Sequence, residues 1–275
     1  MDRENGASKD TAALTRLTVA VNAEQRALIE ETLRVAELPF SQRELPHLPS
    51  TYGIFEAAGG FLAPEEFLVD PARIDAARDR LFAEGLLCDA SEATLRRALQ
   101  EIVKPLLLDE TSDPTRLLRC LEVNSKGVVR SLLDATIRLS HGRELLETFF
   151  FRLARTLAHD TPALETGRHT LPLKELARTL RVGADAAFTE RFHADATLGE
   201  PGLRLVLLDV LPEMPANSWR QKALVAALRD RESNIREAGG EALHELGRSD
   251  LGYDPADPPA EREEIVRKLL TSARG

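Results

Sequence analysis

The apolar residues of this chain recur mostly at steps of three and four, which is the periodicity of an α-helix, and they seldom alternate as in a β-strand. Leu, Ala, Arg and Glu, which favour helices, dominate the sequence. The pattern predicts an all-α protein with no β-sheet of any size. The helices are expected at residues 11–38, 70–84, 91–108, 113–122, 125–140, 143–159, 173–180, 184–192, 202–211, 218–228, 233–246 and 259–271.

Capping residues support several of these helix limits. Asp70 and Asp113 each precede a proline, which suits the first turn of a helix because it has no N–H to satisfy and a fixed φ. Ser218 and Gln221 have the spacing of a capping box. Gly247 stands where a residue in the left-handed conformation would end a helix.

The stretch from residue 39 to 64 interrupts the helical pattern, because it holds four prolines and three glycines. We therefore predict a flexible tail over 1–10, an N-terminal helix and a long loop over 11–64, and a helical repeat domain over 65–275. With 43% hydrophobic residues, the 275 residues suffice for a substantial core. We expect neither a secretory leader nor a membrane span, since charges interrupt every apolar window.

Residues 222–247 read as two short helices around a polar turn, and each helix carries an apolar stripe. Neither helix can bury its stripe alone, so each needs the other and then a neighbouring pair. The sequence therefore predicts a stacked helical hairpin. The stripes comprise Leu224, Ala227 and Leu228 in the first helix and Ile235, Ala238, Gly239, Ala242, Leu243 and Leu246 in the second.

This segment resembles a HEAT repeat, most clearly over residues 219–248, in its apolar pattern together with Asp230, Arg236 and Gly247. The resemblance implies a HEAT-like right-handed α-solenoid of stacked helix pairs, in which Asp230 and Arg236 help to fix the hairpin. The tail at 251–270 is similar to the closing segment of some bacterial HEAT-like proteins. Earlier helix pairs keep only the apolar register, so the first hundred residues are either further repeats or an irregular helical part, which we favour.

No pattern in the sequence indicates a catalytic site, a cofactor or a metal centre. Cys88 and Cys120 are too few for a disulfide framework and are not clustered, which fits a reducing cytoplasm. The chain has no GxSxG elbow, Walker loop or GxGxxG. His244-Glu245 is a single pair, whereas one HEAT-like hydroxylase family needs four such pairs to hold iron. Glu65-Glu66 and Glu263-Glu264 are interpreted as exposed helix faces.

The formal charge of −9 opposes binding to nucleic acid or to an anionic membrane surface. Residues 173–192 have the rhythm of a helix-turn-helix, but Asp185, Phe188 and Glu190 offer little to a phosphate backbone. We expect ordinary helix pairing at this segment and no nucleic acid partner.

The exception to the acidic balance is residues 116–143, where cations outnumber acids. Arg116 and Arg119 lie along one helix face, as do Lys126 and Arg130. The stretch is either a face for an acidic partner segment or a solvated surface that pairs with acids of neighbouring helices.

Three phenylalanines follow directly, and Phe151 lies nearly opposite the arc that Phe149 and Phe150 share. A helix that is apolar on two sides is either sandwiched between layers or touches a partner. Phe151 shares a strip of the helix with Arg155, and aromatic and Arg side chains are enriched where proteins bind one another.

The leading hypothesis is a non-catalytic protein-interaction scaffold or adaptor, whose partner is another protein that binds through an acidic segment. Two alternatives stay open: a HEAT-like nucleic-acid-binding or DNA-repair module, and an enzyme with a site near residues 39–64. The predicted partner-binding residues are Arg116, Arg119, Lys126, Arg130, Arg138, Phe151 and Arg155.

Overall fold

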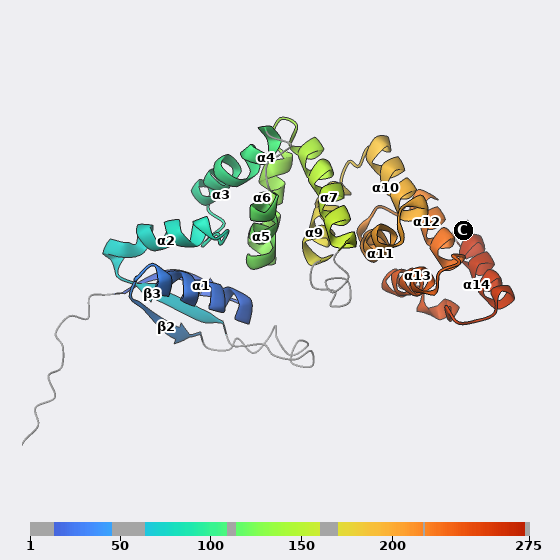
Figure 1. Ribbon diagram of the computed structural model, residues 1–275, viewed down its shortest axis with the longest axis horizontal. Helices are drawn as coiled ribbons and strands as arrows, with labels where there is room; N and C mark the ends of the chain where they lie inside the picture. Colours follow the sequence, from blue (N-terminus) through green and yellow to red (C-terminus); the bar gives the residue numbers. More distant parts are fainter. Residues whose placement is uncertain (1–13, 46–63, 109–113, 160–169, 217, 273–275) are drawn as a thin grey trace, which may run out of the picture. The chain divides into compact units, whose positions relative to one another are not determined.

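The computed structural model describes residues 14–45, 64–108, 114–159, 170–216 and 218–272, and helices account for most of them, as the apolar spacing predicts. Contacts divide the chain into two compact units, Met1–Leu132 and Leu133–Gly275. The division falls within helix α6 (Lys126–Ile137), and Figure 1 labels the helices of both units together with strands β2 and β3.

The first unit opens with a three-stranded antiparallel sheet in the order β1-β3-β2. Its strands are β1 (Thr15–Ala20), β2 (Phe40–Glu44) and β3 (Glu65–Val69). Helix α1 (Ala23–Val35) connects β1 to β2. Because β1 and β2 both run antiparallel to the strand between them, the arrangement is a split β-α-β unit.

This sheet contradicts the expectation that the chain has no strands. Strand β1 occupies the first part of the helix predicted over 11–38 and carries the β-branched residues that favour strands. Asn22 then starts α1, because its side chain accepts a hydrogen bond from the N–H of Gln25 at 2.8 Å. The predicted boundary after residue 64 falls between two paired strands of the sheet.

Helices α1 and α2 (Ile74–Ala83) share one core with the sheet. Phe67 and Val69 are alternate residues of β3, both fully buried, and pack in the same cluster as Ile29 of α1 and Leu81 of α2. Both helices therefore cover the same face of the sheet.

A continuous helical segment follows, and Pro105 explains its irregular middle. Proline has no N–H, and its ring clashes with the carbonyl four residues earlier, so a wider π turn precedes it. That carbonyl, of Glu101, accepts a hydrogen bond from Arg116 (Nη1 to O, 3.5 Å). The elements are α3 (Glu92–Ala98), the π turn (Leu99–Val103), α4 (Lys104–Leu108) and, next in the chain, α5 (Thr115–Val123).

Asn124 joins the connection between α2 and α3 to the end of α5. Its buried side chain accepts from the N–H of Leu87 at 2.8 Å and donates to the carbonyls of Gly85 (2.8 Å) and Cys120 (2.6 Å). Three backbone groups thus depend on one amide, which fixes the path of the chain after α2.

The second unit consists of helices packed in pairs. Helix α10 packs against α11 and α12 against α13, and the two pairs meet through α10 with α12 and α11 with α13. Figure 1 shows α11 and α13 on one side of α10 and α12. Helix α11 also contacts α7 and α9, so it lies in the interior of this unit. The bounds are α7 (Gly142–Ala158), α9 (Thr170–Leu180), α10 (Ala186–Leu198), α11 (Pro201–Val210), α12 (Ser218–Leu228), α13 (Ser233–Glu245) and α14 (Pro259–Ser272).

Helices α12 and α13 form the predicted hairpin, and its predicted stripe is buried apart from Ala238 and Leu246, which are half-buried. A Cβ added at Gly239 would lie 3.0 Å from the Cβ of Ala227, so the two helices approach closely at this glycine.

The turn of this hairpin is held by the two residues that the HEAT resemblance singles out. The Asp230 carboxylate accepts from the N–H of Glu232 at 3.0 Å. Arg236 donates to the carbonyls of Asp230 (3.1 Å) and Arg231 (2.9 Å). Asp230 also forms an ion pair with Arg204 of α11, so the turn is tied to the preceding helix pair.

Two predicted caps are confirmed. Asp70 accepts from the N–H of Ala72 at 2.8 Å, and Gly247 ends its helix with a φ of +73°. Asp113, the tail over 1–10 and the middle of the predicted loop, 46–63, lie outside the described residues. Within the described ranges, every helix is too short or too polar to cross a bilayer.

Candidate functional site

The predicted partner-binding side chains are divided between the two units. In the first unit, Arg119 forms an ion pair with Glu84 at 2.9 Å, and the guanidinium of Arg116 lies 5.6 Å from the centre of the Phe82 ring. These contacts join α5 to α2, so both arginines have partners within the first unit. The remaining predicted residues are Lys126 and Arg130 in the first unit and Arg138, Phe151 and Arg155 in the second.

The other cations of this set differ in their surroundings. Lys126 and Arg130 are exposed on α6. Arg138, which directly follows α6, donates to the carbonyl of Asp134 in that helix at 3.0 Å. Arg155 is exposed and lies 4.0 Å from Asp195 of α10.

The prediction that Phe151 offers its ring to a partner is wrong, because the side chain is only 2% exposed. Its ring meets Phe150 edge-on at 5.3 Å and tilts against Phe188 of α10 at 5.4 Å. The guanidinium of Arg191 covers it at 4.0 Å. Helix α7 is therefore covered on both of its apolar sides. Of the two possibilities for a helix of this pattern, it is the one that is sandwiched between layers.

Phe151 belongs to an aromatic cluster that links three helices. Phe150 lies 6.0 Å from Phe192, and Phe192 lies 5.3 Å from Trp219 at the start of α12. The cluster therefore connects α7, α10 and α12 within the second unit, and it is part of the core.

The expectation that Glu65-Glu66 is an exposed helix face is wrong. Both residues lie on β3 and are buried, and as neighbours in a strand they point to opposite faces of the sheet. Glu65 pairs with Arg26 of α1 at 2.6 Å. Glu66, on the face away from the helices, pairs with Arg16 of β1 at 3.7 Å and with Arg43 of β2.

The aromatic residues of the described strands face the helices. The rings of Phe40 and Phe67 lie 5.7 Å apart and pack with the helix-covered core. Sheets that bind single-stranded RNA by base stacking carry their rings on the open face. In this sheet that face presents the ion pairs of Glu66, which gives no support to the nucleic-acid alternative.

A pocket of about 390 Å³ lies along β1 in the first unit, and we call it the β1 groove. One wall is Arg16–Val19 of β1, and the opposite wall is Leu86–Asp89, which follows α2. Arg78, Gln25 and α6 complete it. Cys88 lines the groove, but burial raises the pKa of its thiol to about 12, so it is a poor nucleophile at neutral pH.

In the second unit, Lys174 connects three helices. From α9 it forms ion pairs with Asp209 of α11 at 2.9 Å and with Glu245 of α13 at 3.5 Å. Burial lowers the pKa of Lys174, but the hydrogen bonds and charges of Asp209 and Glu245 outweigh it, and the pKa lies above its ordinary value. The lysine is therefore a fixed cation between two carboxylates.

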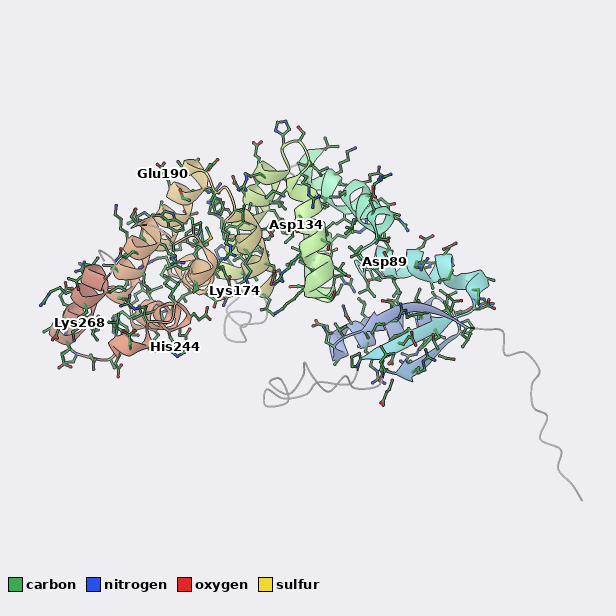
Figure 2. All side chains as sticks on the ribbon, turned by 180° about the vertical axis from the view of Figure 1, so that it is seen from behind. Asp89, Asp134, Lys174, Glu190, His244 and Lys268 are labelled. Carbon is green, nitrogen blue, oxygen red and sulfur yellow. The ribbon has the colours of Figure 1, made fainter. Side chains whose placement is uncertain are left out.

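Glutamates form a row along the exposed side of α13. Glu237, Glu241 and Glu245 follow at four-residue steps, and we call them the acidic row. Glu237 and Glu241 are exposed and form no ion pair within the described part of the chain. Figure 2 places Lys174 and His244, the neighbour of Glu245, on one side of this unit and Glu190 of α10 on another.

The acidic row was not recognised from the sequence, although its spacing is visible there. An acidic helix face is common in a chain of charge −9, and the ion pair of Lys174 depends on residues far apart in the sequence.

No protein-family model, no curated protein and no solved structure matches this chain. Within the described ranges, no group of three or more His, Cys, Asp or Glu side chains is arranged to hold a metal ion.

Proposed function

We propose that this protein is a non-catalytic adaptor and that its second unit binds another protein through the α9, α11 and α13 face. The packing of pair α12–α13 on pair α10–α11 supports a HEAT-like solenoid for this unit, and such stacks serve as extended binding surfaces. A solenoid fold alone does not determine what it binds, so the binding chemistry has to come from particular side chains.

The acidic row is the observation that carries the proposal. Glutamates four residues apart on one helix face repel one another, so the row weakens α13 on its own. Opposite charges from a partner would relieve this repulsion. The face therefore fits a basic protein segment, in place of the acidic partner expected from the sequence for the central helices.

The ion pairs of Lys174 support the same conclusion. They hold Glu245 next to α11 and α9, so one end of the row is fixed in position. A charged row on packed helices loses little conformational entropy on binding, which favours a defined partner over diffuse attraction.

The experiment compares capture by three versions of the full chain. Wild type, Glu241→Lys and Glu190→Lys are immobilised and exposed to an extract of the cells that produce the protein, and the bound proteins are quantified by mass spectrometry. Glu190→Lys is a matched control, because Glu190 is also an exposed glutamate without an ion pair in the described part of this unit.

We expect a protein with a basic segment to be retained by wild type and by Glu190→Lys and to be depleted about tenfold on Glu241→Lys, since a like charge replaces an opposite one. Its association rate should fall as salt is raised. Capture that depends equally on both glutamates, or on neither, would refute the acidic row as the binding face.

A further inference from the structure

Strand β1 is an edge strand, and its outer edge faces the β1 groove. The sheet order places β3 on only one side of β1. Four consecutive residues, Arg16–Val19, line the groove. Because consecutive side chains of a strand point to opposite faces, a pocket that touches all of them runs along the edge of the strand.

The groove separates β1 from the chain segment opposite it. Among the described residues, no backbone hydrogen bond joins β1 to Leu86–Asp89. The Thr18 hydroxyl donates to the Cys88 carbonyl at 3.5 Å, and the side chains of Leu17 and Leu86 belong to the same core cluster. The outer backbone groups of β1 therefore face the groove without a strand to pair with.

The opposite wall is held in place independently of β1. Leu86 and Leu87 are buried, and Asn124 binds the N–H of Leu87 and the carbonyl of Gly85. This anchoring prevents the segment from closing onto β1 without breaking buried hydrogen bonds. The groove is thus a preformed gap at a sheet edge.

Two cationic side chains line the β1 groove. Arg16 and Arg78 both line it, and their own ion pairs are long, 3.7 Å to Glu66 and 3.9 Å to Asp75. The carboxylate on the lining, Asp89, accepts from the N–H of Ser91 at 2.9 Å and also interacts electrostatically with Arg78. Because the ion pairs of Arg16 and Arg78 are long, an incoming carboxylate could approach either guanidinium more closely than Glu66 or Asp75 does.

The geometry points to the β1 groove as a docking site for an extended, acidic peptide segment of a partner protein, which adds a fourth strand to the sheet beside β1. Backbone pairing with the strand edge supplies affinity, and the arginines select for Asp or Glu in the peptide. The site lies on the first unit, so it stands or falls independently of the acidic row.

The test uses the full chain and short random peptides displayed on phage. Peptides enriched on wild type are synthesised, and their affinity is measured by fluorescence anisotropy. Arg78→Glu should weaken binding about tenfold or more, because it places a like charge at the groove. Arg80→Glu is the matched control on the same helix, since Arg80 is exposed and does not line the groove, and it should bind as wild type does.

Two further measurements test the strand pairing itself. Alternate N–H groups of an added strand face β1, so N-methylation of one alternate set should abolish binding and methylation of the other set should not. Hydrogen exchange of the β1 amides should slow when the peptide binds.

The proposal is overturned if both methylated peptides bind equally, if the charge variants bind alike, or if no peptide is enriched. It is also overturned if sedimentation shows a dimer whose protected amides are those of β1, because a second copy would then occupy the edge.

Discussion

Replacing Phe151 by alanine should destabilise the second unit strongly, because its ring is buried among Phe150, Phe188 and Arg191. Truncation of a buried Phe to Ala costs about 3–5 kcal/mol. At about 2–4 °C per kcal/mol for a domain of roughly this size, the melting temperature should fall by about 10 °C. Phe151→Leu keeps most of the apolar volume and should cost less than about 1.5 kcal/mol.

The assay for this prediction is urea unfolding followed by the fluorescence of Trp219, the chain's single tryptophan, which lies 5.3 Å from Phe192 of the same cluster. Far-UV circular dichroism checks that the variants are helical before denaturation. The core assignment is refuted if Phe151→Ala unfolds at the wild-type urea concentration. Loss of partner capture at full stability would restore the ring as a binding anchor.

Three further perturbations test the packing and the charges. Asn124→Ala should lower the free energy of unfolding of the first unit by about 1–3 kcal/mol in urea titrations, because buried backbone groups lose their partner. Gly142→Ala should cost about 1–3 kcal/mol, since its Cβ would lie 1.9 Å from a carbonyl oxygen, whereas Gly127→Ala meets open space and should not destabilise. Burial opposes ionisation of Asp230, but Arg204 and backbone N–H groups outweigh it and lower the pKa below its ordinary value of 3.8. The stability from this carboxylate is therefore present above that pH and lost as the pH falls through the lowered pKa, and Asp230→Asn should reduce this acid-dependent fall in the urea midpoint.

The helical part of the fold follows from the sequence because its signals are local. Apolar stripes at helical spacing and caps such as Asp70 and Gly247 act within one or two turns, and the structure places helices where these signals predict them. The N-terminal sheet was missed because β1 is short and its alternation is broken by the irregularity at Leu17. Asn22 is a helix-capping residue in the middle of the helix predicted over 11–38, and it indicates that this range is not helical throughout.

The site residues were harder to predict because they depend on which elements pack together. Phe151 reads as a surface aromatic on an isolated helical wheel, and α10 buries it. Glu66 reads as a solvated acid, yet two neighbouring strands supply arginines to it. Contacts between segments far apart in the sequence bury Phe151 and pair Glu66. Neither the periodicity nor the composition of the sequence predicts such contacts.

The central claim is that Glu241 contacts a cation of a bound protein, and a double-mutant cycle with the captured partner tests it most directly. Glu241→Lys and a Lys→Glu change in the partner's basic segment are measured singly and together by surface plasmon resonance. The account predicts that each single change weakens binding and that the double change recovers part of the loss, with a coupling energy of about 0.5–3 kcal/mol. Losses that simply add, with no coupling for any cation of the segment, would contradict it.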